Sequence, residues 1–270
     1  MAEADVEKTM SFWEHLDELR DRLRRAVLAY VIAAFGAWYI REWLLGWLVM
    51  PFRKAWVEQN LPGPPLLHFA APSDAFTAYV KQSLIAALVI AAPVIFWQVW
   101  AFIAPGLYAK EKKSAVAFVV SSSSLFMGGG LFGWRVAFPL AFNYFLSLSG
   151  NLGEHGVVIT PTVMMIDYLD FVGQMLLAFG FIFEIPILVL FLSMAGIVNY
   201  LQLWSFGRWF ILVSFIVGAA LTPPDITSQL VMALPMCVLY FFSIGLAYVF
   251  GKRPSPEQID AYRAKKLKKS

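Results

Sequence analysis

The sequence predicts an all-α integral membrane protein with six transmembrane helices and both termini in the cytoplasm. Of its 270 residues, 60% are apolar and only 14% are charged, and the mean hydropathy is +0.67. A soluble domain carries roughly 25% charged residues, so this chain could not cover its surface with polar groups. Six apolar stretches account for most of the length, which leaves no room for a separate soluble domain.

The predicted membrane spans are six apolar windows separated by turn-forming residues. The windows are Leu23–Val49, Phe76–Ile103, Ser114–Phe138, Phe171–Val198, Trp209–Leu221 and Leu230–Phe250. Pro105-Gly106 closes the second window, and Pro223-Pro224 makes a short turn between the last two. Both dipeptides are typical of chain turns rather than of helix interiors.

Two windows depart from the length that a bilayer requires. Trp209–Leu221 has only 13 residues, or about 20 Å of helix, against a hydrocarbon core of about 30 Å. We therefore expect either a bilayer thinned beside this span or shielding of the span by protein. The third window continues through Pro139 into an aromatic group at 142–145, which is typical of a membrane interface.

The distribution of positive charge predicts the orientation. With six spans, 16 of the 21 lysines and arginines fall on the side of the termini. The other five are Arg41, Arg53, Lys54, Lys81 and Arg135. The positive-inside rule then places both termini in the cytoplasm. Three segments follow: a cytoplasmic amphipathic helix at 1–22, a six-span membrane domain at 23–250, and a basic cytoplasmic tail at 251–270, which we expect to contact lipid headgroups rather than nucleic acid.

The segment before the first span combines an apolar face with a cluster of acids. Phe12, Leu16, Leu19 and Leu23 recur at helical spacing, so the segment is predicted to lie at the interface. The polar face carries the acids Glu14, Asp17, Glu18 and Asp21. Like charges four residues apart are unfavourable unless a cation compensates them.

Two interpretations of these acids remain open. Glu18 with Arg22, and Asp21 with Arg25, have the spacing of ordinary helical ion pairs, each contributing about 0.2–0.5 kcal/mol. Alternatively, Glu18 and the isolated Glu111 of the next cytoplasmic loop could each bind a guanidinium bidentately. An extended, arginine-bearing peptide would suit that second arrangement.

Glu184 is predicted near the middle of the membrane, in Phe-Ile-Phe-Glu-Ile-Pro-Ile-Leu. An ionisable group at this depth costs at least about 2.5–3.5 kcal/mol, so it normally faces protein or water. Pro186 should kink the helix nearby. One interpretation is a protonated acid bonded to a free carbonyl or to a neighbouring span; the other is a contact with a partner helix or a proton-linked role.

The loop between the last two spans carries Thr222, Asp225 and Gln229 around its double proline. Asp225 could simply cap the following helix. Together the three side chains could instead form a polar docking point for another helix, because amides and hydroxyls hydrogen-bond across helices in lipid.

Four stretches of this sequence resemble one family. They are His15-Leu16-Asp17-Glu18-Leu19-Arg20, the run from Ala92 to Tyr108 with Glu111 after it, Phe183-Glu184-Ile185-Pro186, and Leu221-Thr222-Pro223-Pro224-Asp225 with Gln229. In order and spacing they resemble the TatC family, the multispanning subunit of the twin-arginine protein translocase. The likeness covers about residues 11–250.

The resemblance implies a receptor for the twin-arginine signal peptides of folded substrate proteins, in the bacterial inner membrane. It places signal-peptide binding on Glu18 and Glu111, with Arg20 and Phe102 beside them, and matches Glu184 to the family's mid-membrane glutamate. It implies that Thr222, Asp225 and Gln229 belong to the region that contacts single-span subunits of the TatA and TatB type.

The same resemblance implies the overall shape and the mode of action. The fold would be a curved wall with a concave face and with short fifth and sixth spans, in an oligomeric complex that exports proteins with the proton gradient. No catalytic residue, cofactor or metal is expected.

Two other function classes fit the sequence less well. A small-molecule secondary transporter could have this topology, but the first three spans do not resemble the last three, and no second broken span matches that at Glu184. An intramembrane enzyme would need a motif such as His-Glu-x-x-His, which is absent. The serines at 121–124 are interpreted as small-residue helix packing.

Overall fold

The computed structural model describes residues 12–103, 112–152, 157–222 and 225–267, and most of them are helical. The helices are α1 (Phe12–Tyr39), α2 (Arg41–Glu58), α3 (Pro72–Ile103), α4 (Lys112–Phe132), the π-helical turn η2 (Gly133–Ala137), α5 (Phe138–Ser147), α6 (Met165–Phe183), α7 (Ile185–Ala195), α8 (Tyr200–Leu221), α9 (Ile226–Phe250) and α10 (Pro256–Leu267). Short strands join the loops at one end: β1 (Leu67–His68) pairs in parallel with β4 (Val163–Met164), and β2 (Gly150–Leu152) is antiparallel to β3 (Val157–Ile159).

The membrane-spanning elements agree with the predicted all-α, six-span class. Among the described residues, five spans are long and apolar enough to cross a bilayer: Pro72–Ile103, Val116–Ser147, Met165–Ala195, Tyr200–Leu221 and Ile226–Phe250. The bent pair of α1 and α2 is long and apolar enough to make a sixth if the two helices are taken as one span. Helices dominate because every backbone group in hydrocarbon must find its partner within its own segment.

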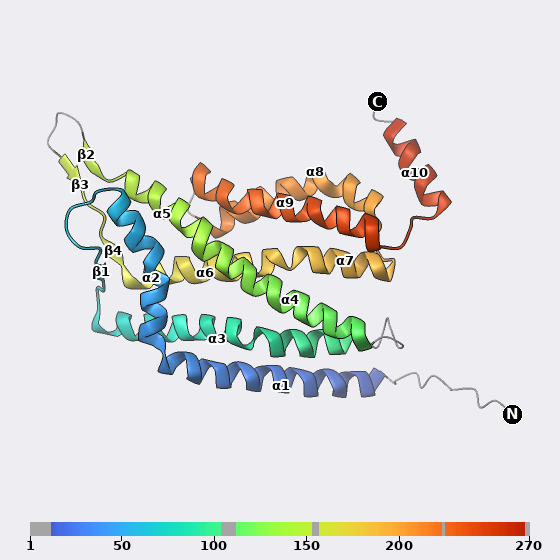
Figure 1. Cartoon of the computed structure of the whole chain (residues 1–270), viewed down its shortest axis with the longest axis horizontal. Helices are drawn as coiled ribbons and strands as arrows, with labels where there is room; N and C mark the ends of the chain where they lie inside the picture. Colours follow the sequence, from blue (N-terminus) through green and yellow to red (C-terminus); the bar gives the residue numbers. More distant parts are fainter. Residues whose placement is uncertain (1–11, 104–111, 153–156, 223–224, 268–270) are drawn as a thin grey trace.

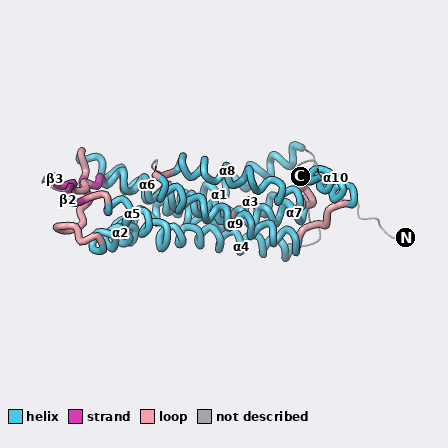
Figure 2. Tube along the Cα trace, turned by 90° about the horizontal axis from the view of Figure 1, so that it is seen from above, coloured by secondary structure: helices cyan, strands magenta, loops and turns pink. Residues whose placement is uncertain are grey.

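The helices lie side by side as a wall, as Figures 1 and 2 show. Helix α1 packs on α3, α3 contacts α4 and α6, and α7 contacts α9, on which α8 packs. Helices α1 and α8 therefore form the two edges. The start of α1 and the end of α9 lie at the same end of the wall (Figure 1), as an even number of crossings requires.

The largest buried cluster lies toward the opposite end, where α2 and α5 cover α6. Phe52 of α2 and Phe138 of α5 are almost completely buried there, with Val172 and Phe179 of α6. Tyr168 stacks on Phe142, and its hydroxyl donates to the Leu48 carbonyl at 2.9 Å. Aromatic packing of this kind holds α2 against the wall, because each ring buries a large apolar area in a fixed geometry.

The predicted first span, Leu23–Val49, is not one continuous helix. Helix α1 ends at Tyr39, and α2 leaves it at an angle of 79°. Arg41 sits at the bend, with its guanidinium 4.8 Å from the Trp38 ring centre, and its carbonyl accepts a hydrogen bond from Gln82. A window average could not detect this break, because apolar residues continue through it.

The predicted shortness of the fifth span is also wrong. Helix α8 begins at Tyr200, well before the apolar window, and its 22 residues extend about 33 Å. Asn199 starts the helix with a capping box that it shares with Gln202. Bilayer thinning therefore does not follow from the length of this helix. Helix α9 has 25 residues, so the short sixth span implied by the family is not observed either.

Close contact between α4 and α6 generates a stability prediction with a built-in control. A β-carbon on Gly129 would overlap the backbone oxygen of Phe179, whereas one on the adjacent Gly128 meets nothing within 4 Å. Gly129→Ala should therefore force α4 and α6 apart and lower the thermal stability of the detergent-solubilised protein. Gly128→Ala should leave the stability unchanged, or raise the free energy of unfolding by up to about 1 kcal/mol, because alanine has a higher helix propensity than glycine. Equal unfolding temperatures for the two variants would contradict this close approach of the helices.

Candidate functional site

The N-terminal end of α1 meets the C-terminal end of α3 through an aromatic contact. The His15 ring stacks on the Phe102 ring, with centroids 4.4 Å apart and an interplanar angle of 16°. The long α1–α3 packing leads up to this contact from the bent end of α1 (Figure 1). Phe102 is thereby brought beside the acidic turn of α1, although the two are far apart in the sequence.

Glu18 lies one turn after His15 and is already engaged by its own helix. The Arg22 Nε donates to Glu18 Oε1 at 2.8 Å, and His15 Nδ1 is 3.9 Å from the other oxygen, Oε2. The ordinary ion-pair interpretation of Glu18 therefore holds in this structure. For Asp21 the predicted partner was wrong, because its carboxylate pairs with Arg24, at 3.2 Å, and not with Arg25.

The remaining residues of the predicted signal-peptide site are placed only in part. Arg20 is exposed on α1, and Phe102 is partly buried near the end of α3. Glu111 lies outside the described residues. His15 was not among the predicted site residues; its position three residues before Glu18, on the same helical face, is the signal that could have indicated it.

Glu184 lies at the joint between α6 and α7 and is only 5% exposed. Its carboxyl group lies beside the Ser122 side chain of α4, whose hydroxyl accepts a 2.9 Å bond from Trp100 Nε1 of α3. Among the described residues, Glu184 Oε1 has no hydrogen-bond partner. Glu184 therefore faces a neighbouring span, and the bond predicted for its carboxyl group stays a prediction. Ser122 bonds to α3, in addition to the small-residue packing predicted for it.

The three polar residues between α8 and α9 are engaged mainly within the protein. Thr222 is buried and its hydroxyl donates to the Gly218 carbonyl at 2.9 Å. Asp225 caps α9 by accepting from the Ser228 backbone N–H at 2.7 Å, and Gln229 Nε2 donates to the Phe215 carbonyl of α8 at 3.0 Å. The helix cap is therefore confirmed for Asp225, and Gln229 joins the two helices.

Comparison with known proteins decides the family. The family model for the Sec-independent protein translocase protein (TatC) matches residues 14–235. The chain belongs to the TatC family. The TatC proteins of Desulforapulum autotrophicum and Koribacter versatilis are 37% and 36% identical to it, over 94% and 95% of this chain and 90% and 92% of their own lengths.

Solved TatC structures have the same fold. The crystal structure of the twin-arginine translocase receptor TatC in DDM superposes with a TM-score of 0.76 at 35% identity, covering 89% of this chain and 100% of the solved one. A second crystal structure of that receptor gives a TM-score of 0.74 over 87% of this chain. The chain is therefore a membrane-embedded, non-enzymatic TatC component of the twin-arginine translocase.

The surroundings of Glu184 predict how strongly different substitutions of this residue should reduce export activity. Glu184→Gln keeps the shape and a group that can bond Ser122, so it should retain much of the export activity. Glu184→Ala should lose more, since it removes the hydrogen-bonding group and leaves any polar group that faces it unpaired, at about 1–3 kcal/mol. Glu184→Arg should be worst, because it brings a permanent charge to mid-membrane.

The measurement is export of a reporter with a twin-arginine signal, compared at equal amounts of inserted protein. Ser122→Ala is the matched comparison, because it removes the hydroxyl beside Glu184 and leaves the acid in place. A Gln variant as inactive as Arg, with Ala tolerated, would exclude the neutral hydrogen-bonding role.

Proposed function

We propose that this chain is the receptor subunit of the twin-arginine translocase in the bacterial inner membrane, with both termini in the cytoplasm. The proposed ligand is the paired-arginine segment of signal peptides on folded proteins, which are exported with the proton gradient. The observation that best supports a site at this place is the His15–Phe102 stack, which joins the acidic turn of α1 to the end of α3.

The proposed recognition is a charge-assisted hydrogen bond from each signal arginine to a carboxylate. Glu18 and Glu111 supply the carboxylates, and Arg20 and Phe102 flank them. A guanidinium bound bidentately by Glu18 would replace Arg22 at Oε1 and also use Oε2, which has only the 3.9 Å His15 contact. Displacing Arg22 costs little, because a helical pair of this kind contributes only about 0.2–0.5 kcal/mol.

The proposed surface for a single-span subunit of the TatA or TatB type is the outer side of α8. This helix packs chiefly on α9 and forms one edge of the wall (Figure 1). Trp209, Leu212 and Ile216 are about half exposed at spacings of three and four residues, and so form one apolar stripe along the helix. Thr222, Asp225 and Gln229 lie where the stripe ends, and there a partner's polar end group could compete for their hydrogen bonds.

The signal-peptide proposal predicts the effect of removing the two charges. Glu18→Gln and Glu111→Gln should each weaken photocrosslinking of a twin-arginine signal peptide, because a neutral amide accepts a guanidinium less strongly. Loss of one charge-assisted bond, about 1.5–3 kcal/mol, corresponds to roughly tenfold or more in affinity. Glu111→Lys should weaken crosslinking further, since a lysine at this position repels the signal peptide's arginines.

Asp21→Asn provides the control. Asp21 is an acid on the same helix that pairs with Arg24 at the surface and does not belong to the proposed signal-peptide site. Membrane insertion and partner assembly should be normal in all variants. Undiminished crosslinking in the Glu18→Gln, Glu111→Gln double variant would refute the assignment of the site.

The partner proposal predicts where intermolecular crosslinks form. A photoreactive amino acid at Leu212 or Ile216 of α8 should crosslink to the single-span subunit in intact membranes. The same group at Ile90 or Val94, equally apolar and exposed on α3, serves as the control. Crosslinks concentrated at the α3 positions would show that the docking surface lies elsewhere.

A further inference from the structure

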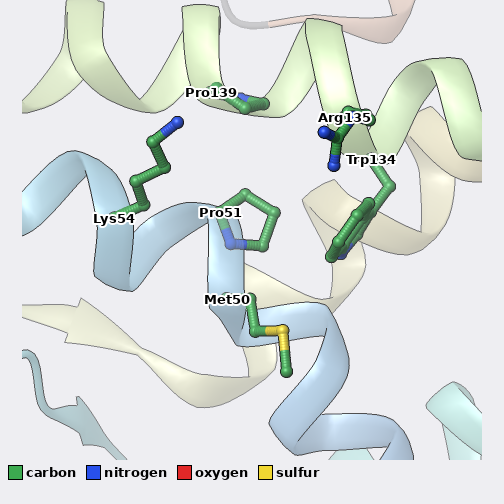
Figure 3. Close-up of a pocket in the computed structure, with 6 residues that line it drawn as sticks. All are labelled: Met50, Pro51, Lys54, Trp134, Arg135 and Pro139. Atoms are coloured by element: carbon green, nitrogen blue, oxygen red, sulfur yellow. The ribbon is translucent and has the colours of Figure 1, made fainter.

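A pocket of about 250 Å³ lies between α2 and the η2–α5 segment, at the end of the wall opposite the start of α1 (Figures 1 and 3). Its lining is Met50, Pro51 and Lys54 from α2, Trp134 and Arg135 from η2, and Pro139 from α5. None of these residues belongs to the signal-peptide or partner surfaces proposed above. Figure 3 shows the Lys54 ammonium and the Arg135 guanidinium on either side of the gap between Pro51 and Pro139.

The π-helical turn determines where Arg135 stands. The Phe138 backbone N–H bonds to the Gly133 carbonyl, five residues back, and Pro139 has no N–H to offer the Arg135 carbonyl. Gly133 allows the turn to approach α6, since a β-carbon there would lie 3.0 Å from the Phe179 ring. Such turns are rare and frequently occur at functional sites. Here the turn carries Arg135 to the rim of the pocket.

Positive charge exceeds negative charge around the pocket. A second pocket of about 280 Å³ shares Met50 and Lys54 with the first and adds Arg53, so the two are continuous. Lys54 Nζ is 3.7 Å from Glu58, a long and exposed pair. Among the described residues, no salt bridge includes Arg53 or Arg135, and both side chains are exposed. Three cations facing one carboxylate favour an anionic ligand.

The surroundings of the pocket favour a lipid over a soluble anion. Trp134 stacks on Trp47 at 4.4 Å, and tryptophans are enriched at the membrane interface. Leu131, four residues before Arg135 toward the middle of the wall, is 53% exposed, and Met50 is 50% exposed. An apolar surface thus runs from the pocket along the helices, where acyl chains would lie. The volume is below the roughly 300–1,000 Å³ of sites for drug-sized ligands, which suits a headgroup alone.

We propose that this pocket binds the phosphodiester headgroup of an anionic phospholipid, with Lys54 and Arg135 on the phosphate and Arg53 beside it. Lysine contributes a mobile point charge, and the guanidinium contributes paired donors that match two phosphate oxygens. The bound lipid would sit in the leaflet opposite the termini and fill the space between α2 and α5.

The test is native mass spectrometry of the full chain released from phosphatidylcholine vesicles that contain a minority of phosphatidylglycerol. The wild type should retain a phosphatidylglycerol molecule. The double variant Lys54→Gln, Arg135→Gln should bind it at least about tenfold more weakly, since two charge-assisted hydrogen bonds are lost. The control is Arg24→Gln with Arg208→Gln, two exposed cations that line neither pocket, which gives the same change in net charge and should bind like the wild type.

Two further arms separate the possible outcomes. The double variant Lys54→Arg, Arg135→Lys keeps both positive charges and should retain the lipid. If it does, the loss of binding in the Gln double variant results from the missing charges and not from a disturbed fold. Inorganic phosphate added in excess should not displace the lipid; displacement would indicate a site for soluble phosphate. Equal retention by the wild type and the Gln double variant, or equal loss in the control variant, would overturn the proposal.

Discussion

The close approach of α4 to α6 is the contact on which the rest of this wall depends. In lipid no hydrophobic force draws helices together, so they associate where small residues let backbones meet. Gly129 and Gly133 of α4 and η2 fit against Phe179 of α6, and Gly180 fits against the Phe126 ring. This packing fixes the position of two features that no single helix determines. They are the Ser122 side chain beside Glu184 and the π-helical turn that carries Arg135.

The polar groups within the membrane follow the same physical rule. A buried donor or acceptor without a partner is costly in hydrocarbon, so most of these groups bond within the protein. The Ser122 hydroxyl joins α4 to α3 through Trp100, and Gln229 joins α9 to α8. Such bonds stabilise the monomer and also limit what each group can offer a partner. Among the described residues, Glu184 Oε1, Ser123 Oγ and Gln98 Oε1 are buried within the spans without such a bond.

The two ends of the wall differ in chemistry. The end that holds the start of α1 presents the Glu18 carboxylate beside an aromatic stack, paired with Arg22 of its own helix. The other end presents cations around a pocket between α2 and α5. A cationic peptide segment suits the first end and an anionic headgroup suits the second. The proposed ligands of opposite sign are therefore bound by different residues, and about 30 Å of apolar helix keeps the two groups of charges apart.

The sequence by itself determined the class, the number of spans and the family. Apolar windows report the transfer of a segment into lipid, a local free energy that depends on composition, and short motifs such as Leu-Thr-Pro-Pro-Asp carry the family resemblance. Tertiary structure decided the rest. The bend at Arg41 and the start of α8 at Asn199 depend on caps and on contacts that hydropathy does not register. The His15–Phe102 stack, the Trp100–Ser122 bond and the pocket at Arg135 each join residues that are tens of positions apart. Their positions follow from how the helices pack against one another. The hydropathy of a single segment depends only on the residues of that segment, so it cannot predict this packing.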